Sequence, residues 1–194
     1  MSAAEEKRRL RREMSPRRSN VDPQVASAAA VSVCERLLNT AALRAAGRIA
    51  LYAALADELP THPLFVALRE QGIVPLLPRV TPDARLEFAP VASWGDLATG
   101  SYGVPEPPAA SGGAALHEGD LVMVPGVAFD EAGHRLGRGA GCYDRTFAGT
   151  GGPLLVGLAY EFQVLPSIPC DGRDREMDAI FTERRARWTG RDTP

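Results

Sequence analysis

Cysteine is scarce in this sequence, and its placement excludes two kinds of site. Cys34, Cys142 and Cys170 are an odd number, lie far apart and form no CxxC pair, which argues against a disulfide framework and against a zinc site. Long apolar runs are also missing, because none approaches the roughly 20 residues that a membrane span needs. The N-terminus lacks the apolar core of a signal peptide. These absences predict a cytoplasmic protein with no membrane partner.

Net charge, aromatic residues and lysine are low as well. A formal net charge of -2 and 6% aromatic residues argue against a nucleic-acid partner. The 194 residues suit one α/β domain over 1–194, with a solvated tail from about residue 185. Among 22 lysines and arginines, Lys7 is the only lysine. An ammonium group is a compact point charge, unlike the planar guanidinium, so position 7 hints at a need for that shape.

Amphipathic segments alternate with short apolar runs along the chain. Helices are expected over 3–14, from Asp22 onward, and over 61–72, where Thr61 caps the start and Gly72 marks the end. Strands are expected over 48–55, 73–80, 85–91, 120–126, 153–160 and 178–183. This alternation predicts an α/β three-layer sandwich, with a mostly parallel central sheet and helices on both faces. Ligands bind such sheets outside the carboxyl ends of the strands.

A glycine-rich stretch, "HRLGRGAGCYDR" at 134–145, follows the expected strand 120–126. Gly137, Gly139 and Gly141 allow backbone N–H groups to approach phosphate oxygens with no Cβ in the way. A flexible surface turn is an equal alternative from the spacing alone. The stretch is not a P-loop, since the chain has no Gly-Lys pair, and its GxGxG spacing differs from the dinucleotide fingerprint. It therefore indicates a phosphate or nucleotide ligand on a different type of fold.

Six motifs in series point to one family. "RLGRGAGCYDR" resembles the RLGxGxGYYDR signature of the 5-formyltetrahydrofolate cyclo-ligases, and Cys142 stands where that signature has its first tyrosine. Ala140 also departs from the residue that the family often has. The other motifs occur in the family's order over roughly residues 7–183: "KRRLR", "ALYAALADELPTHPL", "LPRV", "YGVPEP" and "VGLAYEFQVLPSIPC".

The resemblance implies a reaction and its ligands. The family closes 5-formyltetrahydrofolate to 5,10-methenyltetrahydrofolate with ATP and magnesium, releasing ADP and phosphate, through a phosphorylated formyl intermediate. A monomer that binds a reduced folate and a nucleotide is therefore expected. Nucleotide contacts are expected from Lys7, Arg11, Leu136, Gly137, Arg138, Gly139, Ala140, Gly141, Tyr143 and Asp144, among which Arg138 and Tyr143 are the expected catalytic residues. Folate contacts are expected from Tyr52, Ala53, Glu58, Tyr102 and Glu106, and metal ligands from Asp144 and Asp178.

Plainer interpretations stay open for several of these residues. The run "KRRLRR" also fits a solvated basic helix, Glu58 an exposed acid before a helix, and Asp178 the opening of the last strand. For the whole chain, the alternative function is a non-catalytic or weakly active module that binds folate or phosphate on the same scaffold. Lys7 discriminates between the two, because a passive phosphate binder has no need for the N-terminal helix to reach the glycine stretch.

Overall fold

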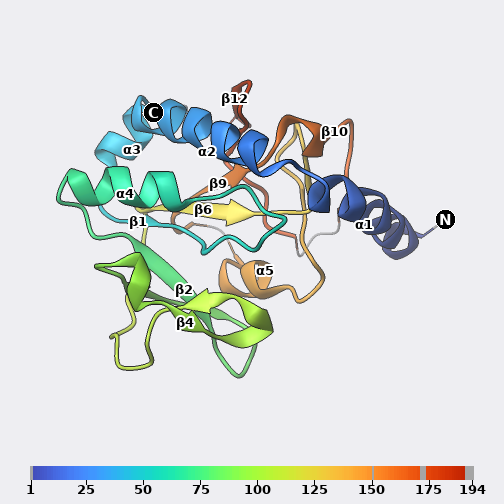
Figure 1. Cartoon of the computed structure of the whole chain (residues 1–194). Helices are drawn as coiled ribbons and strands as arrows, with labels where there is room; N and C mark the ends of the chain where they lie inside the picture. The colour runs from blue at the N-terminus through green and yellow to red at the C-terminus, as the bar shows by residue number, and fades with distance from the viewer. Residues whose placement is uncertain (1, 150, 171–173, 191–194) are drawn as a thin grey trace.

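A seven-stranded mixed sheet forms the centre of the computed structural model, which describes residues 2–149, 151–170 and 174–190 (Figure 1). The strand order is β12-β11-β9-β6-β1-β2-β3. Strands β11, β9, β6, β1 and β2 pair in parallel, whereas β12 and β3 pair antiparallel at the two edges. The prediction of a mostly parallel sheet is therefore confirmed.

The strands are short, and two small sheets accompany the central one. The central strands are β1 (Ile49–Ala50), β2 (Leu76–Val80), β3 (Leu86–Pro90), β6 (Leu121–Pro125), β9 (Leu154–Leu158), β11 (Ala179–Phe181) and β12 (Ala186–Trp188). One small sheet pairs β4 (Ala98–Thr99) with β5 (Pro105–Glu106), and the other contains β7 (Ala128–Asp130), β8 (Arg135–Leu136) and β10 (Val164–Leu165). Short 3-10 turns lie at Trp94–Asp96, Ser101–Gly103 and Glu161–Gln163.

Alternate residues of the central strands face two separate parts of the core. On β6, Leu121 and Met123 pack with α2 (Pro23–Leu38), α3 (Ala41–Ala45) and α4 (His62–Glu70). Val122 and Val124 point the other way, toward the short helix α5 (Cys142–Thr146). Burying each such side chain stabilises the fold by about 1.5–3 kcal/mol. Helices thus cover both faces, as expected, although unevenly.

The first helix, α1 (Ala3–Ser19), packs on the small sheet of β7, β8 and β10 through Leu10 and Met14. Ser2 and Glu5 form a capping box at its start. The helix continues five residues beyond the predicted end at residue 14, and Pro16 lies inside it. Met14 and Arg18 are buried, so tertiary contacts stabilise the last turn despite the proline.

Three local predictions need correction. The expected strand 48–55 contains only β1, because the chain leaves the sheet there and turns toward α4. Thr61 precedes α4 but does not cap it, since its hydroxyl donates to the carbonyl of Tyr52 at 2.5 Å. The tail from about residue 185 is not simply solvated, because β12 pairs with β11 and Trp188 packs edge-on against Phe181; residues 191–194 lie outside the described part.

No helix in the described ranges combines the length and the apolar character that crossing a membrane requires.

Candidate active site

A cavity of about 590 Å³ lies where β1, β2 and β6 end. The chain just after β1 and the carboxyl ends of β2 and β6 supply part of its wall, in agreement with the expectation for parallel sheets. Every site residue predicted from the sequence lines this cavity except Asp178: Lys7, Arg11, Tyr52, Ala53, Glu58, Tyr102, Glu106, Leu136, Gly137, Arg138, Gly139, Ala140, Gly141, Tyr143 and Asp144.

The N-terminal helix brings two cations to the cavity. Lys7 and Arg11 are four residues apart on α1, which places them on one face of the helix. The Nε of Arg11 donates a 2.8 Å hydrogen bond to the carbonyl of Gly137. The Nζ of Lys7 lies 2.6 Å from a carboxylate oxygen of Asp174, which also lines the cavity. The basic run is therefore not merely a solvated helix face.

Residues 137–141 of the glycine-rich stretch form an exposed turn, the glycine turn, between β8 and α5. Gly139 has φ of 115° and Gly141 has φ of 70°, and both values lie in the region that L side chains rarely adopt. A Cβ at Gly139 would meet no atom within 4 Å, so conformation and not space demands glycine there. Residues 138–140 are exposed and residues 137–141 line the cavity, so their backbone N–H groups are the candidates for a phosphate cradle.

Asp144 lies on α5, where it meets a buried arginine. The Nη2 of Arg135, whose side chain is 6% exposed, donates to Asp144 at 2.9 Å. The same guanidinium lies over the ring of Tyr143, 5.3 Å from its centroid. Burial raises the pKa of Tyr143, and the carboxylate of Glu58 adds to that effect. The Tyr143 hydroxyl therefore stays protonated near neutral pH and can donate a hydrogen bond.

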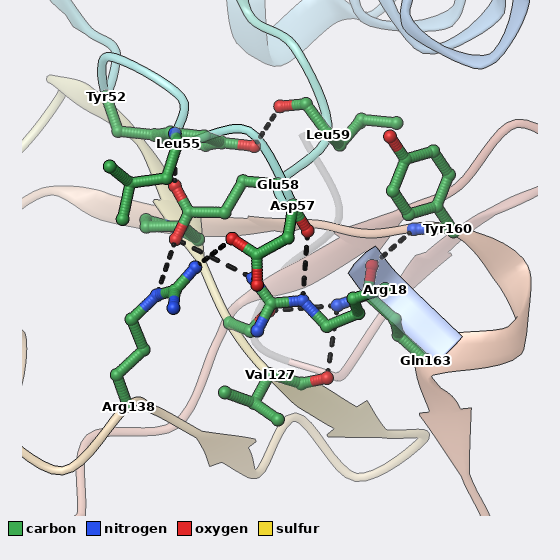
Figure 2. A network of polar contacts seen from close by, with 12 residues as sticks. Arg18, Tyr52, Leu55, Asp57, Glu58, Leu59, Val127, Arg138, Tyr160 and Gln163 are labelled. Atoms are coloured by element: carbon green, nitrogen blue, oxygen red, sulfur yellow. Dashed lines mark hydrogen bonds and ion pairs between the residues drawn. The ribbon is translucent and has the colours of Figure 1, made fainter. Parts of the chain in front are cut away.

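Glu58 and Arg138 contact each other across the cavity (Figure 2). Glu58 is nearly buried; its Oε2 accepts from the backbone N–H of Leu55 at 3.0 Å, and its Oε1 accepts from Nε of Arg138 at 3.1 Å. A second carboxylate, Asp57, also accepts from Arg138. Burial acts to lower the pKa of Arg138, but Glu58 and Asp57 raise it overall. The site thus pairs a phosphate-binding candidate with the carboxylate expected to bind folate.

The side chains of the remaining predicted folate contacts differ in whether hydrogen bonds within the protein already hold them. The Tyr52 ring lines the cavity, but its hydroxyl donates to the carbonyl of Leu59 at 2.8 Å (Figure 2). Glu106 accepts from the backbone N–H groups of Ser101 and Val80 and so holds the turn beside it. Tyr102 is 70% exposed at the rim, with φ of 57°. Only the ring of Tyr102 is therefore free to reach a bound ligand by side-chain movement alone.

Asp178 is not among the residues that line the cavity. Its carboxylate accepts from the backbone N–H of Leu155 at 2.8 Å and lies 3.3 Å from Arg175, and the residue is only 3% exposed. The structure does not bring Asp178 together with Asp144, and its observed role is to join β9 to the start of β11. The plainer interpretation, the opening of the last strand, fits this position.

The residues of the cavity fit magnesium only if a bound nucleotide and waters supply some of the ligands. In the described part of the chain, no three His, Cys, Asp or Glu side chains group to hold a metal ion. Magnesium is commonly held by one or two carboxylates together with phosphate oxygens and waters. Asp144, at the edge of the glycine turn, is suited to that mode when a nucleotide is bound.

Three residues at or next to the cavity were not singled out as site residues from the sequence: Arg135 and Asp174 line it, and Asp57 contacts Arg138 beside it. Asp57 directly precedes Glu58, and Asp174 lies four residues beyond the end of the last quoted motif at Cys170. Arg135 lies inside the glycine-rich stretch 134–145. An acidic pair between a strand and a helix was a usable signal for Asp57, whereas the contact of Asp174 with Lys7 spans 167 residues and leaves no local pattern.

The chain is similar to known proteins of one family. The model of the "5-formyltetrahydrofolate cyclo-ligase family" matches residues 3–183. The chain is 32% identical to the 5-formyltetrahydrofolate cyclo-ligase of Mycolicibacterium smegmatis, over 74% of this chain and 77% of that protein. It is 31% identical to the Haemophilus influenzae enzyme of the same name, over 88% and 94%. The NMR structure of Aquifex aeolicus 5,10-methenyltetrahydrofolate synthetase superposes with a TM-score of 0.81 at 30% identity, covering 96% of this chain and 95% of that one.

Proposed function

The chain belongs to the 5-formyltetrahydrofolate cyclo-ligase family of enzymes, and on that premise we propose that it closes 5-formyltetrahydrofolate to 5,10-methenyltetrahydrofolate with ATP and magnesium, releasing ADP and phosphate. One observation supports this most. A single cavity is lined by the cations of α1, by the glycine turn and by Glu58. A reaction that joins a phosphate donor to a folate needs both ligands held in one site.

The proposed chemistry removes an oxygen that is otherwise a poor leaving group. The formyl oxygen attacks the γ-phosphorus of ATP, and ADP leaves. The folate nitrogen N10 then attacks the activated formyl carbon and loses its proton. Phosphate departs with the former formyl oxygen, and the five-membered ring closes. Phosphoryl transfer depends mainly on positioning and on neutralising charge, so the protein needs cations and donors and no nucleophile of its own.

The cationic half of the cavity has the residues for these tasks. Lys7, Arg11 and Arg138 would contact the phosphates, and the backbone of 137–141 would cradle them. The protonated hydroxyl of Tyr143 would donate to the formyl oxygen or to the transferring group. Asp144 would hold magnesium, which neutralises phosphate charge when bound.

The other half suits a pterin. A carboxylate has two acceptor oxygens and can pair with the planar donor edge of an aminopyrimidine, which is the role proposed for Glu58. The Tyr52 ring and Ala53 form an apolar wall beside it. Tyr102 would cover the ligand from the rim. Glu106 would act by shaping the turn that carries Tyr102, because its carboxylate already accepts backbone hydrogen bonds.

The test is direct. Purified protein is mixed with 5-formyltetrahydrofolate and MgATP, and the absorbance of the methenyl product is followed together with ADP release. We expect both products in equal amounts, and neither when ATP or magnesium is left out. Binding of folate and of a non-hydrolysable ATP analogue without any turnover would instead support the non-catalytic module. Action as a monomer in the cytoplasm stays a prediction, and gel filtration checks the oligomeric state.

A further inference from the structure

The Arg138 guanidinium is shared by two neighbouring carboxylates. It contacts Glu58 through Nε at 3.1 Å and Asp57 through Nη2 (Figure 2). The Arg138 side chain is 45% exposed, whereas Glu58 is 8% and Asp57 is 20% exposed. The arginine therefore reaches from the exposed glycine turn onto a more buried acidic pair.

Asp57 also forms an ion pair with a buried arginine, Arg18. The Nη2 of Arg18, at the end of α1, lies 3.1 Å from Oδ2 of Asp57, while Oδ1 faces Arg138. The Nε of Arg18 also donates to the backbone carbonyl of Asp57 at 3.1 Å. The side chain of Arg18 is 2% exposed and that of Asp57 is 20% exposed, so the arginine holds Asp57 from the buried side. The two carboxylate oxygens of Asp57 thus have separate partners, one structural and one at the cavity.

In the proposed function, the pterin and Arg138 compete for the carboxylate of Glu58. Oε2 of Glu58 already accepts from the backbone N–H of Leu55, and Oε1 is occupied by Arg138. A pterin that pairs with this carboxylate also needs Oε1 and therefore competes there with the guanidinium. Asp57 has no part in pterin binding in the proposed function, so its contact with Arg138 does not face this competition.

We propose that Asp57 is a positioning residue that holds Arg138 at the phosphate side of the cavity once folate occupies Glu58. The inference rests on the proposed function, in which Arg138 contacts the transferring phosphate. Without Asp57, an arginine on a glycine-rich turn would sample many conformations and reach the reacting geometry less often.

A double-mutant cycle tests this role. Asp57→Asn keeps the shape of the side chain and removes its charge, and Arg138→Met removes the guanidinium. We expect Asp57→Asn to lower kcat/KM for ATP about tenfold in the wild-type background, and to change it less than about twofold when Arg138 is already Met. The dissociation constant of AMP-PNP, measured by calorimetry with 5-formyltetrahydrofolate bound, should follow the same pattern. Equal losses in both backgrounds would show that Asp57 does not act through Arg138 and would overturn the proposal.

Two controls separate positioning from folding. Asp83→Asn removes a carboxylate that pairs with Arg85 at the surface, 3.2 Å away, and it should leave the kinetics unchanged. A thermal melt of Asp57→Asn is recorded with the kinetics, because Arg18, which lies 3.1 Å from Asp57 and 3.9 Å from Glu58, loses one charged partner in this variant. If Asp57→Asn does not fold, Asp57→Ser removes the carboxylate with a smaller side chain, and the same cycle is run with that variant and the same expected losses.

The failure of the inference can be told apart from the failure of the proposed function. A wild-type protein that forms no methenyl product and binds no AMP-PNP would remove both. A wild-type protein that turns over normally, with additive effects of Asp57→Asn and Arg138→Met, would remove only the role of Asp57.

Discussion

Arg11, on the first helix, donates a hydrogen bond to the backbone carbonyl of Gly137, 126 residues further along the chain. This contact connects α1 to the glycine turn, and it places Lys7 one helical turn away at the same cavity. The N-terminal helix is therefore part of the candidate active site, which is the feature that favours an enzyme over a passive phosphate binder.

Lys7→Ala should raise the KM for ATP. A hydrogen bond to a charged group contributes about 1.5–3 kcal/mol, which corresponds to roughly 10- to 100-fold. Lys7→Arg keeps the charge but not the compact shape, and we expect an intermediate loss. Steady-state kinetics with varied ATP measures the effect. Arg8→Ala is the matched control, because Arg8 is an exposed cation of the same helix that does not line the cavity. Unchanged ATP kinetics for Lys7→Ala would exclude this residue from the site.

Gly139→Ala should impair nucleotide use and leave the melting temperature nearly unchanged. The φ of 115° strains any residue with a Cβ by about 1–3 kcal/mol, so the turn should shift away from the cradle conformation. We expect kcat/KM for ATP to fall about tenfold. Gly112→Ala is the control, since Gly112 lies in an exposed loop where a Cβ meets nothing within 4 Å. Normal kinetics of Gly139→Ala would argue against a cradle at this turn.

Asp144 and Asp178 should respond differently to neutralisation. Asp144→Asn should increase the magnesium concentration needed for half-maximal rate by about tenfold, because magnesium affinity depends on the charge of its ligands. Asp178→Asn should leave that concentration unchanged. It should lower the stability by about 1–3 kcal/mol, because Arg175 loses its charged partner in a buried position. A magnesium titration of the rate and a thermal melt distinguish the two. An increased magnesium requirement in Asp178→Asn would restore it as a metal ligand.

Tyr52→Phe should change the dependence of stability on alkaline pH. Burial raises the pKa of Tyr52 above the value of about 10 for an exposed tyrosine. Above that pH the unfolded chain releases the phenolic proton and the folded chain does not, so the wild type loses stability as the pH rises. The phenylalanine variant lacks this loss. At neutral pH it should be less stable by about 0.5–1.5 kcal/mol, since the bond to Leu59 is gone. Urea unfolding at several pH values measures both effects, and parallel curves would contradict the assignment.

The local patterns of the sequence were enough to predict most elements, and the resemblance to the family supplied the predicted residues that line the cavity. Two examples are the start of α2 at Asp22 and Pro23 and the apolar runs that form β6 and β9. These features depend on residues that are close in the chain, so a sequence pattern is enough to predict them. The positive φ of Gly139 and Gly141 likewise follows from residue type, because only glycine adopts such conformations readily. Helix α1 extended past residue 14 because the burial of Met14 and Arg18, a tertiary effect, outweighed Pro16.

By itself the sequence determined which chemical groups this protein has and roughly which stretch carries each. The tertiary structure alone decided which of them meet: Lys7 with Asp174, Arg138 with both Asp57 and Glu58, and Asp178 with the backbone of β9 and not with Asp144. These pairs join residues far apart in the chain, and their formation depends on how the sheet and α1 pack. A carboxylate looks the same in a sequence whether it faces a ligand or a backbone N–H, because only its folded surroundings decide which partner it finds.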